Sequence, residues 1–313
     1  MTLGVLRVAL PLALLITLAV GCAHDLPGWK VASTEHFQLY TDQTAHNYEW
    51  VLDRLEDVYG GLTASLFSAN IPPTEVFLFS PTEFQELLGG LWAGMAASDV
   101  GKRGVLVMYD GWEPAFVERT AAHELAHAFI GATYRKPPVW FNEGLATYAE
   151  SIKVQNGAVL FGSRHVGIAD SAATGQLVPV AELFSGNWGK FHGDWEVRHY
   201  TTAWAVVHYI WHGEKKTLRP RFDAFGAALS AEAGRPGASA RAWQATFPDV
   251  PLSELDGRLL DHMHEAFGQS KDSVVGFRYS HPDRMPTRLE PADMSYVDQV
   301  RQQLRKHRRA EKL

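Results

Sequence analysis

The chain has 313 residues, of which 46% are hydrophobic and 20% charged, a balance that is ordinary for a globular protein with a sizeable core. Its formal net charge of −6 argues against nucleic acid as the main partner, although the segment from Arg301 to Lys312 is locally basic. We expect that segment to be a solvated, frayed helix; contact with a membrane surface or an envelope polymer is the alternative.

The first 22 residues have the pattern of an export signal. A short basic start precedes an apolar run from Val8 to Val20, which is too short to predict a membrane span, and small residues follow. Cys22 is the only cysteine, and the preceding Leu18-Ala-Val-Gly21 resembles the lipobox of bacterial lipoproteins. This resemblance implies a lipid anchor on Cys22, and Ala23 favours the periplasmic face of the outer membrane. A secreted or periplasmic protein with an incidental cysteine is the alternative.

Strands and helices alternate through the first half of the mature chain. Runs of β-favouring residues predict strands, and apolar residues at helical spacing predict helices between them. Ser80-Pro81 and Gly89-Gly90 bound the second helix, with Ser80 as its N-cap. The pattern predicts an α+β fold with a small twisted sheet packed on helices. The predicted strands are 35–40, 75–79 and 104–109, and the predicted helices are 44–67, 81–88 and one that starts near 114–117.

The second half is predicted to be mostly helical. Asn156-Gly157 indicates a turn of a small hairpin, a loop-rich stretch follows from 162 to 193, and helices are predicted at 200–212, 218–233, 238–247 and 252–267. The predicted organisation is a signal over residues 1–22, an N-terminal lobe over 30–155, a mainly helical lobe over 156–268, and an irregular tail with a basic C-terminus over 269–313.

The segment Thr120-Ala-Ala-His-Glu-Leu-Ala-His-Ala-Phe-Ile130 contains an His-Glu-x-x-His pattern within a helix-forming run. Positions i and i+4 share one helix face, so His123 and His127 can reach a single metal ion. Glu124 lies too far round the helix to be a third ligand, but close enough to hold a water molecule beside the metal.

Glu143 is the candidate for the third ligand, sixteen positions after His127 in Trp140-Phe-Asn-Glu-Gly-Leu-Ala-Thr-Tyr148. A turn through Lys136-Pro137-Pro138 and a second helix would return Glu143 to the histidine pair. Two imidazoles and one carboxylate leave the fourth position of one Zn²⁺ ion open, as a catalytic site requires. The expected chemistry is hydrolysis by metal-activated water, with Glu124 as the general base that later protonates the leaving amine.

Together, His-Glu-Leu-Ala-His and Asn-Glu-Gly-Leu-Ala resemble the motifs of the gluzincin clan of zinc metallopeptidases, closest to its peptidase-MA-like bacterial families. The resemblance covers roughly residues 35 to 215, and only the two motifs are specific. It implies a zincin-like N-terminal lobe, zinc bound by His123, His127 and Glu143, and a peptide or protein substrate. It also implies that strand 104–109 is an edge strand above the metal that pairs with the substrate backbone, from which loose sequence specificity would follow.

Gluzincins of the aminopeptidase type carry a tyrosine at the start of a later helix, and His199-Tyr-Thr-Thr-Ala-Trp204 has that form. The resemblance implies that the Tyr200 phenol donates a hydrogen bond to the developing oxyanion, a contact worth on the order of a hundredfold in rate. An aromatic that only anchors the junction of the lobes is the alternative role for Tyr200, and His199 is the alternative donor.

The chain also departs from the aminopeptidase pattern. The connection between His127 and Glu143 is shorter, and the Gly-x-Met-Glu-Asn segment that grips a free N-terminus is absent, because residues 90–97 contain no glutamate. An endopeptidase or a specialised envelope hydrolase is therefore expected. Glu150, two turns after Glu143, is expected to face solvent. Five other histidines fall outside any metal spacing and are expected at the surface or in the core: His192, His208, His212, His262 and His264.

These observations predict an exported, lipid-anchored zinc metallopeptidase, with the membrane contacted through the anchor on Cys22. The alternative is a non-catalytic envelope lipoprotein that uses the gluzincin fold as a binding or assembly scaffold. The presence of Glu124 favours the enzyme, because a scaffold needs the metal ligands at most and not the base.

Overall fold

The computed structural model describes residues 28–42, 48–89, 94–97, 100–102, 104–109, 114–155, 158–163, 167–186, 196–267, 274–279 and 289–311. The predicted export signal, including Cys22, lies outside these residues. No helix in the described part of the chain is long and apolar enough to cross a lipid bilayer.

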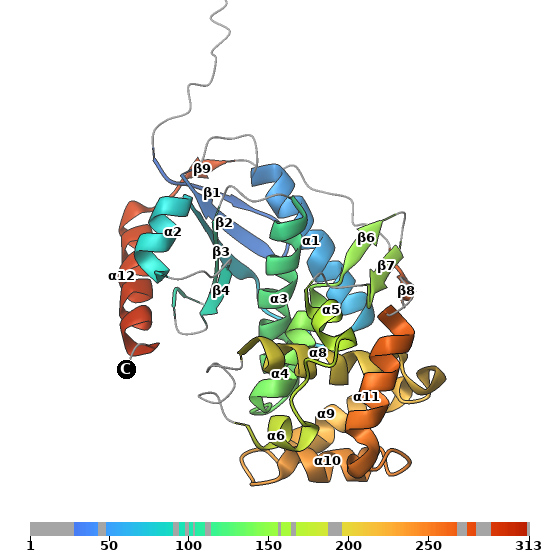
Figure 1. Ribbon diagram of the computed structural model, residues 1–313. Helices are drawn as coiled ribbons and strands as arrows, with labels where there is room; N and C mark the ends of the chain where they lie inside the picture. The colour runs from blue at the N-terminus through green and yellow to red at the C-terminus, as the bar shows by residue number, and fades with distance from the viewer. Residues whose placement is uncertain are drawn as a thin grey trace, which may run out of the picture.

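A mixed sheet of six described strands forms the upper half of the molecule (Figure 1). Its order is β4-β5-β3-β2-β1-β9, and β2, β3 and β5 are parallel, whereas β1, β4 and β9 run antiparallel to their neighbours. The α+β class predicted from the sequence is confirmed. The strands are β1 (Lys30–Ser33), β2 (Phe37–Thr41), β3 (Thr74–Phe79), β4 (Gly94–Ala97), β5 (Val105–Tyr109) and β9 (Glu290–Pro291).

Helices cover both faces of this sheet, which explains why its central strand is almost continuously apolar. In β3, Val76 and Leu78 belong to the core shared with α1 (Tyr48–Ser65) and α3 (Pro114–Thr133). Phe77 and Phe79 alternate with them and belong to a second core on the side of α2 (Pro81–Leu88) and α12 (Met294–Glu311). The helix α3 therefore lies on one face of the sheet, and the C-terminal helix α12 on the other.

The lower half is a helical assembly, and a small three-stranded sheet, β6-β7-β8, lies beside α1. The core that contains α1 and α3 continues into these helices without interruption. The elements are α4 (Val139–Ala149), β6 (Lys153–Gln155), β7 (Ala158–Phe161), α5 (Ile168–Ala173), α6 (Val180–Ser185), α8 (Glu196–His212), the 3-10 turns η1 (Glu214–Lys216) and η2 (Arg219–Arg221), α9 (Phe222–Ala231), α10 (Ala238–Thr246), α11 (Leu252–Phe267) and β8 (Val275–Arg278).

The boundaries of the second helix illustrate how local sequence sets the structure. The Ser80 hydroxyl accepts a hydrogen bond from the Glu83 amide at 3.3 Å, Pro81 occupies the first turn, and Gly89 ends the helix in a left-handed conformation with φ 66°. A side-chain acceptor at the N-cap and a glycine after the last turn are the usual signals for these positions. The predicted N-cap is confirmed.

The prediction that strand 104–109 forms the edge of the sheet was wrong. This strand, β5, lies between β3 and β4, and β4 is the end strand of the described sheet on that side. The sequence of β4, Gly94-Met-Ala-Ala97, is too short and too rich in small residues to show the alternation typical of a strand.

The prediction of an irregular tail over 269–313 was also wrong. Residues 275–278 form β8, residues 290–291 pair with β1, and residues 294–311 form α12. Apolar residues of α12 recur at helical spacing and fill the second core, and Arg301 pairs with Glu83 of α2 at 2.5 Å. The buried residues of this stripe are Tyr296, Val297, Val300 and Leu304.

Two further details concern the second half of the chain. The stretch 162–193, predicted to be loop-rich, contains the short helices α5 and α6. The division into lobes at residues 155 and 156 stays a prediction.

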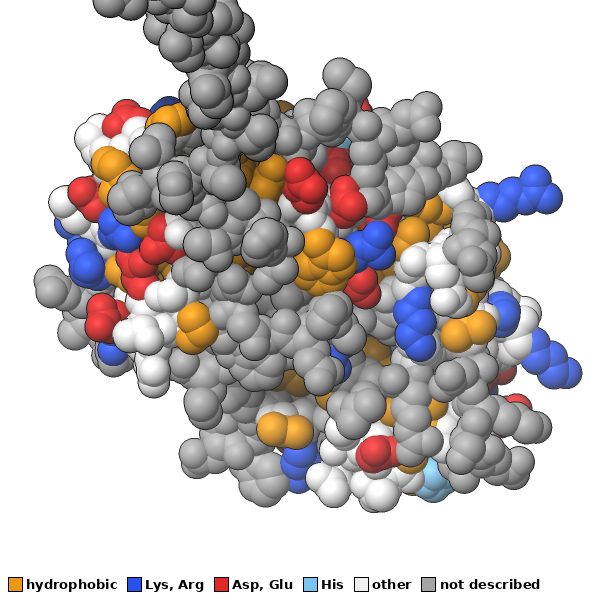
Figure 2. Space-filling model, turned by 90° about the horizontal axis from the view of Figure 1, so that it is seen from above, with side chains coloured by type: hydrophobic (Ala, Val, Ile, Leu, Met, Phe, Trp, Pro, Cys, Tyr) orange, Lys and Arg blue, Asp and Glu red, His pale blue; other side chains and the backbone are white. Residues whose placement is uncertain are grey.

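On the face seen in Figure 2, the acidic and basic side chains of the described residues are interspersed.

Candidate metal centre and active site

The helix α3 presents His123, Glu124 and His127 on the side away from its buried stripe. Its small and apolar residues, such as Ala122 and Ala126, are fully buried in the core, whereas the side chains of His123 and His127 keep 18% and 20% of their surface exposed. The small residues let α3 approach its neighbours closely, and the i and i+4 spacing directs both imidazoles toward α4.

The helix α4 is held in place by its aromatic start and by a close approach to α8. Trp140 and Phe141 are buried, and the Trp140 indole donates a hydrogen bond to the Ser239 hydroxyl at 2.9 Å. At Gly144, an added Cβ would lie 2.6 Å from the backbone oxygen of Ala203 in α8. Only glycine fits at this crossing, which fixes the neighbouring Glu143 beside both α3 and α8.

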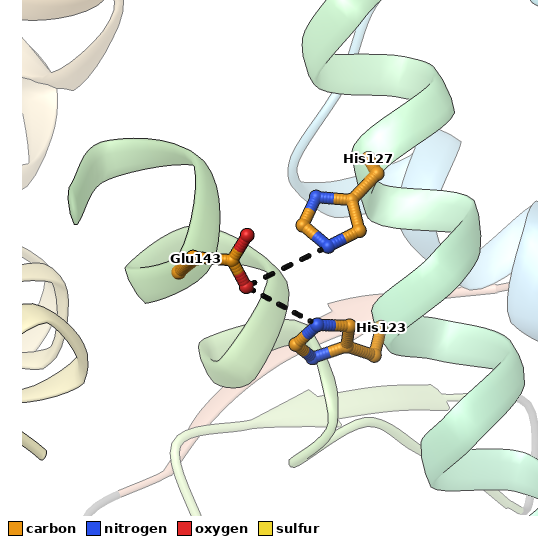
Figure 3. Close-up of side chains that lie close together, drawn as sticks. All are labelled: His123, His127 and Glu143. Atoms are coloured by element: carbon orange, nitrogen blue, oxygen red, sulfur yellow. Dashed lines mark ion pairs between the residues drawn. The ribbon is translucent and has the colours of Figure 1, made fainter. Parts of the chain in front are cut away.

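Glu143 points between the two histidines of α3 (Figure 3). Its Oε2 lies 3.5 Å from His123 Nε2 and 3.7 Å from His127 Nε2, and the Glu143 side chain is only 4% exposed. One candidate ligand atom of each residue lies within 4.8 Å of the others, and this is the one such group of three found in the described part of the chain. The structure therefore brings together the three residues that the motifs predicted, and this group could hold a metal ion.

The donor set and its spacing fit zinc. Zinc bonds of about 2.1 Å in a tetrahedral arrangement place neighbouring ligand atoms about 3.4 Å apart, close to the separations of Glu143 from the two histidines. Two imidazole nitrogens and one carboxylate oxygen also form the ligand set of catalytic rather than structural zinc sites.

Glu150 was expected to face solvent, and this expectation was wrong. Its Oε1 lies 2.8 Å from His123 Nδ1, so the carboxylate accepts a hydrogen bond from the ring nitrogen that faces away from Glu143. This contact fixes the tautomer that leaves Nε2 free as a ligand. Burial opposes charge on His123, but the hydrogen bonds to Glu143 and Glu150 outweigh it and raise the pKa of His123 well above its ordinary value.

Tyr200 also lies at this centre. Burial raises the pKa of the Glu143 carboxyl, but the hydrogen bond with His123, the charges of both histidines and a hydrogen bond from the Tyr200 phenol together lower it. The alternative donor, His199, is buried on α8 and directs its Nε2 toward Glu182, 3.8 Å away. Of the two candidates, Tyr200 is therefore the one hydrogen-bonded to a candidate ligand.

Glu124 stands apart from the three candidate ligands and faces the edge strand β4. A Cβ added to Gly94 would lie 3.5 Å from Glu124 Cγ, so the start of the strand lies beside the Glu124 side chain. Glu124 and His127 also line a cavity of about 480 Å³ between α3 and the sheet. The candidate base Glu124 therefore lies between the start of β4 and this cavity.

Three other histidines, His208 and His212 of α8 and His262 of α11, form a separate group that we call the histidine cluster. His208 Nδ1 lies 2.9 Å from His262 Nε2, and His212 Nε2 lies 2.9 Å from the Tyr148 hydroxyl. Burial, with the unfavourable proximity of His212 and His262, lowers the pKa of His208 well below its ordinary value. Burial, with His262, Lys216 and Arg219 nearby, lowers the pKa of His212 to about 3, and burial lowers the pKa of His262 to about 4.

The other sequence expectations have the following outcomes. His208 and His212 are buried in the core, whereas His264 is exposed. His192 lies outside the described residues.

Searches against protein-family models and against curated proteins found no match for this chain.

Proposed function

We propose that this protein is a zinc-dependent peptidase of the gluzincin type, and that it is exported and anchored by a lipid on Cys22. The observation that carries the catalytic proposal is the convergence of His123, His127 and Glu143, with Glu124 beside them on the same helix but outside the ligand group. A carboxylate that is not a ligand, placed next to an open metal position, is the arrangement that hydrolysis requires.

In this proposal, His123, His127 and Glu143 would hold one Zn²⁺ ion, which when bound lowers the pKa of a water molecule and polarises the scissile carbonyl. Glu124 accepts a proton as the water oxygen adds to the carbonyl carbon. It returns the proton to the amide nitrogen as the carbon–nitrogen bond breaks, which releases a carboxylate and an amine.

The surrounding residues position these groups. Glu150 holds the His123 ring through its Nδ1, and the packing of Gly144 against α8 keeps Glu143 buried between the histidines. The Tyr200 phenol, which hydrogen-bonds Glu143, is the candidate donor to the oxyanion that develops on the substrate. The end strand β4 offers backbone groups to an extended peptide.

The test compares the wild type with Glu124→Gln and His123→Ala. The wild type should bind one zinc and cleave members of a diverse peptide library, Glu124→Gln should retain the zinc without turnover, and His123→Ala should lose the zinc. A wild type that binds no zinc contradicts the proposal. A zinc-loaded wild type that cleaves no peptide, together with normal complementation of a deletion strain by Glu124→Gln, supports a scaffold instead.

The anchor is tested separately by metabolic labelling with a fatty-acid analogue and by membrane fractionation. Incorporation that disappears in Cys22→Ser supports lipidation. Equal recovery of the wild type and Cys22→Ser in the soluble fraction argues against it.

A further inference from the structure

The cavity beside Glu124 adjoins the candidate active site and is lined mainly by apolar residues. It measures about 480 Å³, which lies within the range of pockets that bind small molecules or side chains. Glu124 and His127 stand at one part of its wall, and Ala128, Gly131 and Ala132 continue the wall along α3. Apart from Glu124, His127 and Thr74, the lining residues of this described pocket carry apolar side chains or none.

The direction of β4 relates this cavity to a bound peptide. The strand starts at Gly94, against Glu124, and ends at Ala97, which lines the cavity. An extended peptide that pairs with β4 in the slightly more stable antiparallel manner has its N-terminal part beside Ala97. Since Glu124 marks the scissile bond, the cavity then lies on the N-terminal side of that bond.

We propose that this cavity is a specificity pocket for a large apolar side chain on the residue that precedes the scissile bond. The proposal rests on the proposed peptidase function and names its substrate class: peptides with leucine, isoleucine, valine, methionine or phenylalanine at that position. It also differs from the loose specificity expected from backbone pairing alone, because the cavity lining adds selection by the side chain.

Gly131 provides a way to fill the cavity without disturbing the fold. It lies within α3 at an exposed position, and a Cβ added there would meet no atom within 4 Å. A leucine at this position therefore has open space around it. Because Gly131 lines the cavity, the leucine side chain can occupy part of the cavity. Gly257 of α11 matches it as a control, because it is also exposed in a helix and its added Cβ also meets nothing within 4 Å.

The experiment profiles cleavage of a peptide library by the zinc-loaded full chain, as wild type, Gly131→Leu and Gly257→Leu. The wild type should prefer large apolar residues before the scissile bond. In Gly131→Leu, the ratio of kcat/KM for leucine to that for alanine at this position should fall at least tenfold, which is within the effect of a few methylene groups in a pocket. Gly257→Leu should keep the wild-type profile, and thermal unfolding should show both variants folded.

Each contrary result has a distinct meaning. If the wild type cleaves but shows no apolar preference at this position, or if Gly131→Leu leaves the profile unchanged, the pocket assignment is wrong and the peptidase proposal stands. An apolar preference that Gly131→Leu shifts only for the residue after the scissile bond overturns the antiparallel orientation. A zinc-loaded wild type that cleaves nothing overturns the peptidase function and the pocket with it.

Discussion

Replacing Glu150 by glutamine tests whether this carboxylate prepares His123 to bind zinc. The substitution keeps the length of the side chain and an acceptor oxygen, but removes the negative charge that lies 2.8 Å from His123 Nδ1. The Glu150 side chain is 19% exposed, so solvent screens this charge only in part. Hydrogen bonds to charged groups contribute about 1.5–3 kcal/mol. At about 1.4 kcal/mol per factor of ten, Glu150→Gln should weaken zinc binding about 10- to 100-fold.

The assay is competition for zinc between the protein and a chromophoric chelator of known affinity. Glu56→Gln is the matched control, because Glu56 Oε2 makes the same kind of contact with His36 Nδ1 at 2.7 Å, outside the metal centre. Glu56→Gln should bind zinc like the wild type. The reasoning about Glu150 is refuted if Glu150→Gln binds zinc within a factor of two of the wild type, or if both variants lose the same affinity.

Three further predictions concern catalysis, packing and pH. Tyr200→Phe should lower kcat about a hundredfold at full zinc occupancy if the phenol stabilises the oxyanion; weaker zinc affinity with unchanged kcat would instead mean that it only positions Glu143. Gly144→Ala should lower the free energy of unfolding by about 1–3 kcal/mol in urea titrations, because its methyl group would meet the α8 backbone, and should be more destabilising than Gly131→Ala. The depressed pKa values of the histidine cluster mean that its three histidines take up protons below about pH 6.5 in the unfolded metal-free chain but not in the folded chain. Their contribution to stability should therefore be complete above that pH, and the free energy of unfolding should fall by at least about 2 kcal/mol by pH 5. Equal free energies of unfolding at pH 7 and pH 5 would contradict this assignment of neutral buried histidines.

The three candidate metal ligands could be predicted because their positions follow from helix geometry. His123 and His127 share a face by spacing alone, and the prolines before Val139 force a turn that returns Glu143 to them. Glu150 carried a similar signal, since it lies seven residues after Glu143, two turns along the same face of the helix, where it can reach the far side of the same histidine. The expectation that it faces solvent took account of this spacing but not of the far side of the His123 ring, which Glu150 reaches.

Other features could not be predicted, because they depend on tertiary contacts. The edge strand β4 has only four residues, three of them glycine or alanine, and is recognisable only by its pairing with β5. The α12 helix is mostly polar, with a narrow apolar stripe. This stripe is buried only because it packs against the second face of the sheet, and the sequence of the helix alone does not show that contact. The cavity beside Glu124 likewise results from how α3 packs against the ends of several strands.

The strand order places β1, which is near the predicted lipid anchor in the sequence, far from β4. The first strand, β1, starts eight residues after Cys22, and the edge strand β4 lies four strands away from it across the sheet. Four steps of about 4.8 Å separate them by about 19 Å. A lipid on Cys22 would therefore tether the protein through the β1 side of the sheet, the side remote from β4 and from the candidate active site.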